Sequence, residues 1–125
     1  MSVDYLTIDD LLVLAERMLG PEFEIIDIGL LQSAVARPQQ TAFGEDAYPS
    51  IHEKAAALLH SLVANHALRD GNKRLGWAGT VLFYAMNGVH LPEHEDEQVE
   101  FVVAIAAGRL SYVQEIAKTL QTWTR

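Results

Sequence analysis

The residues best suited to chemistry lie in one nine-residue stretch, His66 to Arg74, which reads His-Ala-Leu-Arg-Asp-Gly-Asn-Lys-Arg. Three of the chain's nine Lys and Arg fall within it, although the chain carries a net charge of −8. A cationic cluster on an acidic protein indicates a local anion site rather than a general affinity for polyanions. Apolar helical patterns flank the stretch, so we expect a helix, a loop and a second helix. The N-terminus of that second helix would offer free N–H groups and a positive dipole end to phosphate.

The first polar residues of the stretch each have a chemical and a structural interpretation. A neutral His66 imidazole is a candidate general base for a hydroxyl proton, or else a plain C-terminal helix cap. Asp70 is a candidate ligand of Mg²⁺, which takes one or two carboxylates together with phosphate oxygens of the substrate, or else the N-cap of the second helix. Gly71 allows a positive φ or a close approach of phosphate, and a simple turn would explain it equally well.

The last three residues favour anion binding more strongly. Asn72 is a candidate phosphate donor or a helix cap. Lys73 and Arg74 place two cations in the first turn of a helix, where they oppose the dipole, and a bound polyphosphate would reverse that penalty. We expect Arg69, by contrast, to be a solvated loop charge.

Length and composition limit the class of protein. A chain of 125 residues is expected to form a single domain spanning residues 1–125. The absence of cysteine excludes disulfides and thiolate metal sites, and fits a cytoplasmic protein. There is no signal-peptide pattern and no apolar run long enough for a membrane span. A pI near 4.9 argues against direct binding of nucleic acid, which needs a broad basic face.

Helical periodicity covers almost the whole chain, so we expect an all-α fold of about six helices. Each has an expected start signal. These are Thr7 with Asp10, Asp27, Ser50 with Glu53, Asn72, the acidic run 93–97, and Ser111 with Gln114. Gly76 and Gly79 inside the fourth helix are easiest to explain if another helix approaches closely there.

The helical period breaks between Pro38 and Pro49. Two prolines and Gly44 bracket a polar segment that contains Phe43 and Tyr48. We interpret it as a flap or short hairpin over the site, with a plain surface loop as the alternative.

The stretch resembles the signature of the Fic/Doc superfamily, and within it the death-on-curing (Doc) toxins, whose motif runs H-x-F-x-[D/N]-[A/G]-N-K-[R/K]. The motif is matched at His66, Asp70, Gly71, Asn72, Lys73 and Arg74. Leu68 stands where the family usually has the phenylalanine that anchors the loop in the core. The likeness extends to the Ala-Arg-Pro-Gln segment, Phe43-Gly44, Tyr48-Pro49 and Asn87-Gly88, and so covers nearly the whole chain.

The resemblance implies an all-α Fic/Doc fold with a central helical hairpin around the motif loop and a short flap beside it. It also implies transfer of part of a nucleoside triphosphate to a protein hydroxyl. Enzymes of the family that transfer AMP have a second glycine where this chain has Lys73. Members of Doc type transfer the γ-phosphate of ATP instead. The resemblance therefore implies a Mg-ATP-dependent protein kinase in which His66 is the base, Asp70 holds Mg²⁺, and Gly71, Asn72, Lys73 and Arg74 bind phosphate.

The resemblance also implies partners. The substrate class is elongation factor Tu, modified on a threonine so that translation stops, and residues 38–49 would align the target by strand-like pairing. A Phd-type antitoxin would silence the enzyme through a C-terminal helix, which we expect in a groove between the N-terminal helices and the motif hairpin. Three alternatives remain: transfer of AMP, a non-catalytic module that only binds antitoxin, and a metal-free ribonuclease using His66, Lys73 and Arg74.

Overall fold

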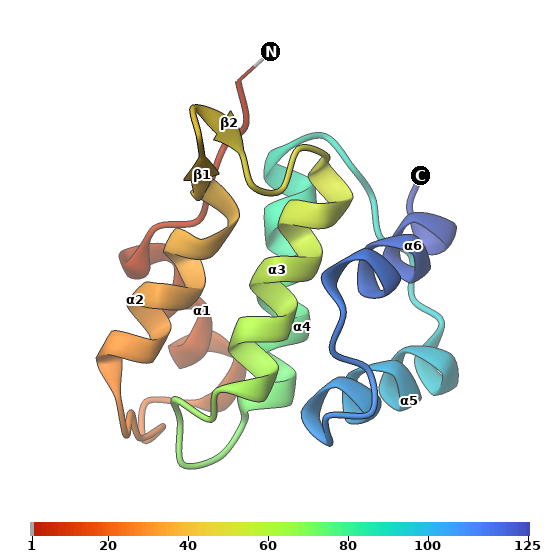
Figure 1. Cartoon of the computed structure of the whole chain (residues 1–125). Helices are drawn as coiled ribbons and strands as arrows, with labels where there is room; N and C mark the ends of the chain where they lie inside the picture. Colours follow the sequence, from red (N-terminus) through yellow and green to blue (C-terminus); the bar gives the residue numbers. More distant parts are fainter. Residues whose placement is uncertain (1) are drawn as a thin grey trace.

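The computed structural model describes residues 2–125, and the elements in that range are almost all helical (Figure 1). The helices are α1 (Ile8–Leu19), α2 (Ile28–Ala36), a 3₁₀ turn (Arg37–Gln39), α3 (Ile51–Ala64), α4 (Asn72–Met86), α5 (Glu95–Ala106) and α6 (Val113–Trp123). A two-stranded hairpin, β1 (Thr41–Ala42) and β2 (Glu45–Asp46), is the only sheet of the described residues. The expected all-α fold is therefore confirmed. None of these helices is both long and apolar enough to cross a membrane.

Helix α3 is the centre of the molecule. It packs against α2, α4, α5 and α6 (Figure 1), and nine of its residues are buried. Helix α4 returns antiparallel beside it, so the two form a central hairpin whose connecting loop holds the motif. A Cβ at Gly76 would lie 2.5 Å from Val63 Cγ2, and one at Gly79 would lie 3.2 Å from Leu62 Cδ1. The close helix approach expected from these two glycines is confirmed.

The contact at Gly76 predicts a stability effect that opposes helix propensity. Gly76→Ala gains about 1 kcal/mol from propensity but forces a methyl group into Val63, and overpacking of this kind costs about 1–3 kcal/mol. We expect a lower free energy of unfolding in urea titrations. Adding Val63→Ala should recover part of the loss, because it removes the methyl group that clashes. If Gly76→Ala alone were at least as stable as wild type, the close approach of the two helices would be contradicted.

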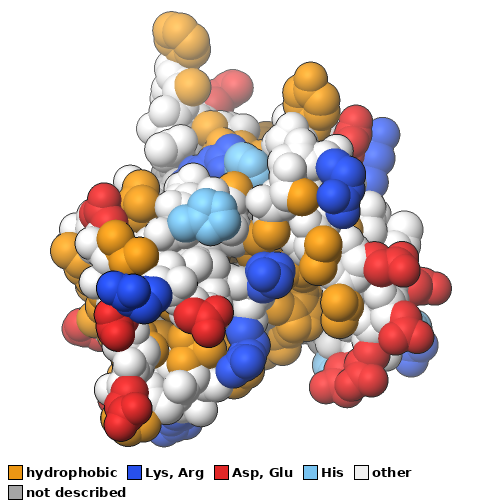
Figure 2. Space-filling model, turned by 90° about the horizontal axis from the view of Figure 1, so that it is seen from below, with side chains coloured by type: hydrophobic (Ala, Val, Ile, Leu, Met, Phe, Trp, Pro, Cys, Tyr) orange, Lys and Arg blue, Asp and Glu red, His pale blue; other side chains and the backbone are white. Residues whose placement is uncertain are grey.

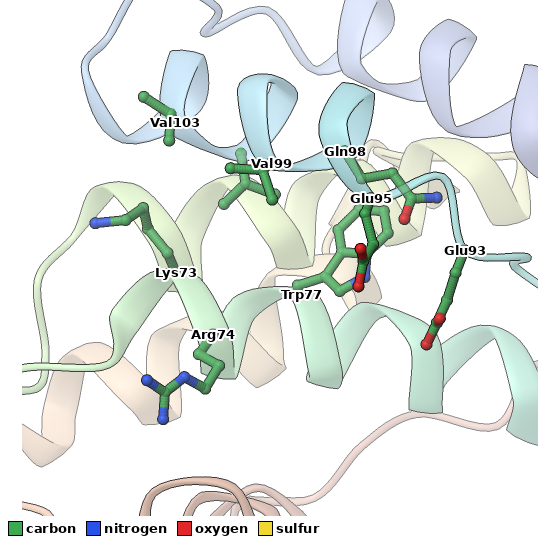
Figure 3. A pocket seen from close by; sticks show the side chains of 9 residues that line it. Lys73, Arg74, Trp77, Glu93, Glu95, Gln98, Val99 and Val103 are labelled. Atoms are coloured by element: carbon green, nitrogen blue, oxygen red, sulfur yellow. The ribbon is translucent and has the colours of Figure 1, made fainter.

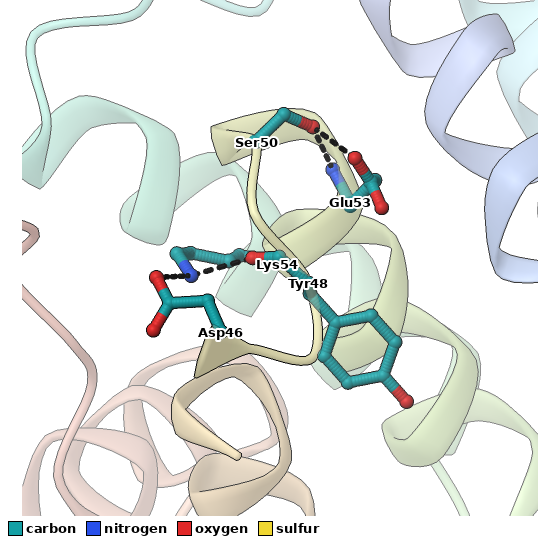
Figure 4. A network of polar contacts seen from close by, with 5 residues as sticks. All are labelled: Asp46, Tyr48, Ser50, Glu53 and Lys54. Carbon is teal, nitrogen blue, oxygen red and sulfur yellow. Dashed lines mark hydrogen bonds and ion pairs between the residues drawn. The ribbon is translucent and has the colours of Figure 1, made fainter. Parts of the chain in front are cut away.

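Most of the helix starts follow the sequence signals. Thr7 and Asp10 form a reciprocal capping box on α1, and Asp27 caps α2. The Ser50 hydroxyl accepts from the Glu53 N–H and donates to the Glu53 carboxylate (Figure 4). The expected cap at Ser111 is wrong: α6 begins one residue later, with Tyr112 as its N-cap and no side-chain cap.

The hairpin is confirmed, but its expected position over the motif is wrong. It lies at the start of α3, whereas the motif loop follows the end of α3 (Figure 1). The 14 residues of α3 put roughly 21 Å between the two. The buried ammonium of Lys54 holds the hairpin down, through Asp46 Oδ2 at 3.1 Å and the Tyr48 carbonyl (Figure 4). Residues 38–49 are thus anchored to the far end of α3, away from the motif loop.

Two half-buried histidines on α3 predict a pH dependence of stability. The pKa of His60 is below its ordinary value of 6.5 because of burial and the Arg37 guanidinium, which lies 2.9 Å from Nδ1. Burial also lowers the pKa of His52. Their contribution to stability is therefore complete above pH 6.5 and falls as pH decreases below 6.5, where the unfolded chain takes up protons first. Urea titrations from pH 8 to pH 5 should show this fall, and His60→Asn should reduce it.

Candidate active site

The motif loop is held by its own side chains. His66 has a φ of +51°, a left-handed conformation that is uncommon outside glycine and that turns the chain away from α3. Leu68, in the place of the usual aromatic residue, is fully buried and anchors the loop in the core. The Asn72 amide bonds both backbone groups of Leu68, accepting from its N–H at 3.0 Å and donating to its carbonyl at 2.9 Å. The Asn72 side chain therefore braces the loop and does not cap α4.

A second segment, from the α1–α2 connection, supports the loop from outside. The Ala67 carbonyl accepts from the Ile26 and Asp27 N–H groups, and the Arg69 N–H donates to the Glu24 carbonyl. Ile25 and Leu68 face each other as an antiparallel bridge. The Arg69 side chain, expected to be a solvated charge, is exposed but pairs with Glu24 at 2.8 Å. Sequence reasoning missed this segment, because no local pattern marks a pairing of residues more than forty positions apart.

The N-terminus of α4 is open to an anion. Gly71, with a φ of +91°, is the N-cap, and no side chain caps the helix. The backbone conformation favours glycine here, and a Cβ at Gly71 would also lie 2.7 Å from Leu19 Cδ2, so that the leucine side chain would have to shift. The first turn has no acidic residue and carries Lys73 and Arg74, both exposed. The structure thus keeps the combination of free N–H groups and cations that the sequence indicated.

Asp70 and His66 both belong to the loop that leads into this helix start, and both side chains are exposed. Asp70 does not cap α4. Its Oδ1 accepts a hydrogen bond from the Gly71 N–H at 2.9 Å, and its Oδ2 has no hydrogen-bond donor within residues 2–125. One hard carboxylate oxygen beside an open helix N-terminus would suit Mg²⁺ if a bound phosphate and water supplied its other ligands. No group of three or more His, Cys, Asp or Glu among residues 2–125 could hold a metal ion by itself.

Two hollows adjoin the start of α4: both are lined by Arg74, and the larger is lined by Lys73 as well. The larger, about 350 Å³, is an apolar groove between α4 and α5 (Figure 3). Trp77 and Val99 line its middle, Lys73 lies at one end, and Glu93 and Glu95 lie at the other, while Arg74 points away from α5. The smaller hollow, about 240 Å³, is polar and lies between the motif and the end of α1. Viewed from the motif end, Lys and Arg side chains occupy the middle of the surface beside apolar residues, and acidic side chains lie on both sides of them (Figure 2).

A motif loop of this composition, carried on a central α3–α4 hairpin, is the combination that the sequence resemblance implied. The comparison with known families leads to the same family. The chain belongs to the Fic/DOC family, whose model matches residues 5–84. A similar individual protein is Toxin Doc of Mycolicibacterium smegmatis (strain ATCC 700084 / mc(2)155). It is 52% identical over 88 residues, which cover 70% of this chain and 68% of that protein. The motif lies within the residues that the family model matches, and α5 and α6 lie beyond them.

Proposed function

We propose that this chain is the toxin of a toxin–antitoxin pair, and that it acts as a cytoplasmic Mg-ATP-dependent protein kinase of Doc type on a translation factor of the elongation factor Tu class. The name and identity of the M. smegmatis relative support the toxin role. The observation that carries the chemistry is the uncapped α4 N-terminus with two cations in its first turn, directly after the loop that holds His66 and Asp70. A charged donor set of this kind stabilises the negative charge that develops during phosphoryl transfer.

The proposed reaction uses the chain's own groups as follows. The N–H groups of Asn72, Lys73 and Arg74 and the two cationic side chains bind the triphosphate. His66 takes the proton of the target hydroxyl as its oxygen bonds to the γ-phosphorus. The bond from that phosphorus to the β–γ bridging oxygen breaks, and ADP leaves. Mg²⁺ held by Asp70 neutralises phosphate charge when bound.

Lys73 favours transfer of the γ-phosphate over transfer of AMP. Its side chain starts in the first turn of α4, beside the N–H groups that would otherwise be open to the α-phosphate. The test is to label purified elongation factor Tu in parallel reactions with α-labelled and γ-labelled ATP. Label from the γ position alone supports the kinase. Label from the α position would replace it with AMP transfer, and no label from either would favour a module that only binds antitoxin.

The antitoxin belongs in the α4–α5 groove rather than between the N-terminal helices and the motif, where the hollow is smaller and polar. The groove is apolar in its middle, as a groove for an amphipathic helix must be. Its charged ends also suit a helix. Glu93 and Glu95 would face the positive N-terminus of the bound helix, and Lys73 would face its negative C-terminus.

A substitution in the groove should separate inhibition from activity. Val99 is 61% exposed on the α5 wall, so Val99→Arg should leave the fold and the toxicity intact. It should weaken antitoxin binding by about 10²-fold or more, because it puts an unpaired charge into an apolar contact. Titration calorimetry with the purified antitoxin measures this. Val13→Arg, at an exposed position on α1, is the matched control, and equal effects from both would reject the groove.

A further inference from the structure

The tip of the β1–β2 hairpin carries an aromatic residue in a strained conformation. Ala42 pairs with Glu45, so Phe43 and Gly44 form a two-residue turn, and both have a positive φ, of +54° and +81°. Such a turn favours asparagine, aspartate or glycine at its first position, because a bulky side chain is strained there. The Phe43 side chain is fully exposed, so no packing within residues 2–125 offsets the strain.

The base of the hairpin is held from two sides, so its tip has a fixed position. The buried Lys54 ammonium bonds Asp46 and the Tyr48 carbonyl (Figure 4), and the Arg37 Nε–H donates to the Tyr48 hydroxyl at 3.0 Å. A single exposed apolar residue is ordinary. Exposure combined with backbone strain and a rigid base is typical of a residue that is preorganised for a contact.

We propose that Phe43 is a docking anchor for the target protein: it enters an apolar pocket on the target surface, remote from the hydroxyl that the motif loop modifies. This inference rests on the proposed function, because the partner is the protein substrate of that reaction. An ordinary protein interface buries about 800 Å² on each partner, a patch roughly 30 Å across. One folded target can therefore contact both the motif loop and the hairpin, which are separated by the length of α3. An aromatic side chain that fills a pocket contributes much of the binding energy of such an interface.

The charge around the tip favours this partner over a second copy of the chain. Residues 41–46 include Glu45 and Asp46 but no Lys or Arg, and the cation beneath them, Lys54, is buried. Two tips in contact would bring these carboxylates together. A tip seated on another part of a second copy would build open chains rather than a closed dimer. The anchor therefore fits a different protein, with an apolar pocket bordered by Lys or Arg, and the antitoxin helix already has its place in the α4–α5 groove.

The first arm of the test separates the aromatic ring from the strain. Phe43→Ala removes the ring and stays strained, whereas Phe43→Asn removes the ring and relieves the strain. With purified elongation factor Tu as the probe, both variants should raise its KM about tenfold or more and leave the KM for ATP unchanged. Only Phe43→Asn should raise the urea midpoint of unfolding above that of wild type. Tyr112→Ala, which removes a side chain that is 69% exposed, is the matched control and should leave the KM for elongation factor Tu unchanged.

The second arm measures binding without transfer. In a His66→Ala background, titration calorimetry should show that Phe43→Asn raises the Kd for elongation factor Tu by the same factor as the KM. The Kd for the purified antitoxin should not change. Sedimentation velocity should give the same oligomeric state with and without the Phe43 ring.

The outcomes separate the docking anchor from the kinase. A wild-type KM and Kd in Phe43→Asn, or an equal loss in Tyr112→Ala, overturns the anchor and leaves the kinase in place. No transfer by the wild type overturns the kinase on this target, and the effect of Phe43→Asn on the Kd then still decides for or against the anchor. Weaker antitoxin binding or a lost self-association in Phe43→Asn assigns the tip to the antitoxin or to a second copy, and overturns the proposal. A urea midpoint for Phe43→Asn no higher than that of Phe43→Ala removes the strain on which the anchor rests, and overturns it as well.

Discussion

Replacing His66 with alanine should lower the rate of target modification roughly 10²- to 10⁴-fold, the range expected for loss of a general base. The free energy of unfolding should fall far less than it would for loss of a core residue, because the side chain is exposed at the end of α3 rather than packed in the core. The rate is measured as incorporation of label from γ-labelled ATP into elongation factor Tu, and stability as a urea titration of the same preparation.

The backbone of His66 requires a matched control. Its φ of +51° is strained for alanine, and asparagine adopts this region more readily. His66→Asn therefore keeps the loop conformation and removes the imidazole. Both variants should lose activity equally. If His66→Asn kept activity within a factor of two of wild type, the residue would serve to shape the loop, and the role of base would have to pass to another group.

Replacing Lys73 with glycine should weaken phosphate transfer on the order of 10²- to 10³-fold, as for the removal of one charge-stabilising donor from a transfer site. The exposed ammonium has no ion-pair partner among residues 2–125, so it is available to a phosphate. Removing the whole side chain also opens the first-turn N–H groups of α4. We therefore expect a new, weaker labelling of the target from α-labelled ATP.

Lys73→Gln distinguishes the effect of losing the positive charge from the effect of opening space beside the α4 N–H groups. It removes the charge but keeps most of the side chain, so it should lose γ-transfer without gaining α-transfer. Lys118→Gly, at an exposed position on α6, controls for the loss of a lysine elsewhere. Full γ-transfer by Lys73→Gly would mean that the N–H groups and Arg74 suffice for the phosphate.

The positions of the helices and of the motif could be predicted from the sequence, because both depend on patterns among neighbouring residues. Thr7, Asp27 and Ser50 cap the helices that their side chains predict, since a cap depends on three or four neighbouring residues. The spacing of Gly76 and Gly79 indicated a close helix approach because glycine inside a helix costs stability unless something needs the space.

Features that depend on distant residues could not be predicted in this way. The side chain of Asn72 was a candidate for phosphate or for a cap, and it bonds Leu68 because the loop brings the two together. The hairpin at residues 41–46 was predicted as a hairpin but misplaced, since only the length and direction of α3 decide which end it occupies. The pairing of residues 24–27 with the motif loop has no local signal at all.

That pairing has a consequence for the dynamics of the molecule. Glu24 and Arg69 are 45 positions apart, so their contact closes a long loop of chain, and it forms only when α1, α2 and the central hairpin are in place together. The motif loop and the α1–α2 connection should therefore open and close as one cooperative unit. In native-state hydrogen exchange, the Ile26, Asp27 and Arg69 amides would share a single opening free energy. A ligand that restrains either segment would then slow exchange in both.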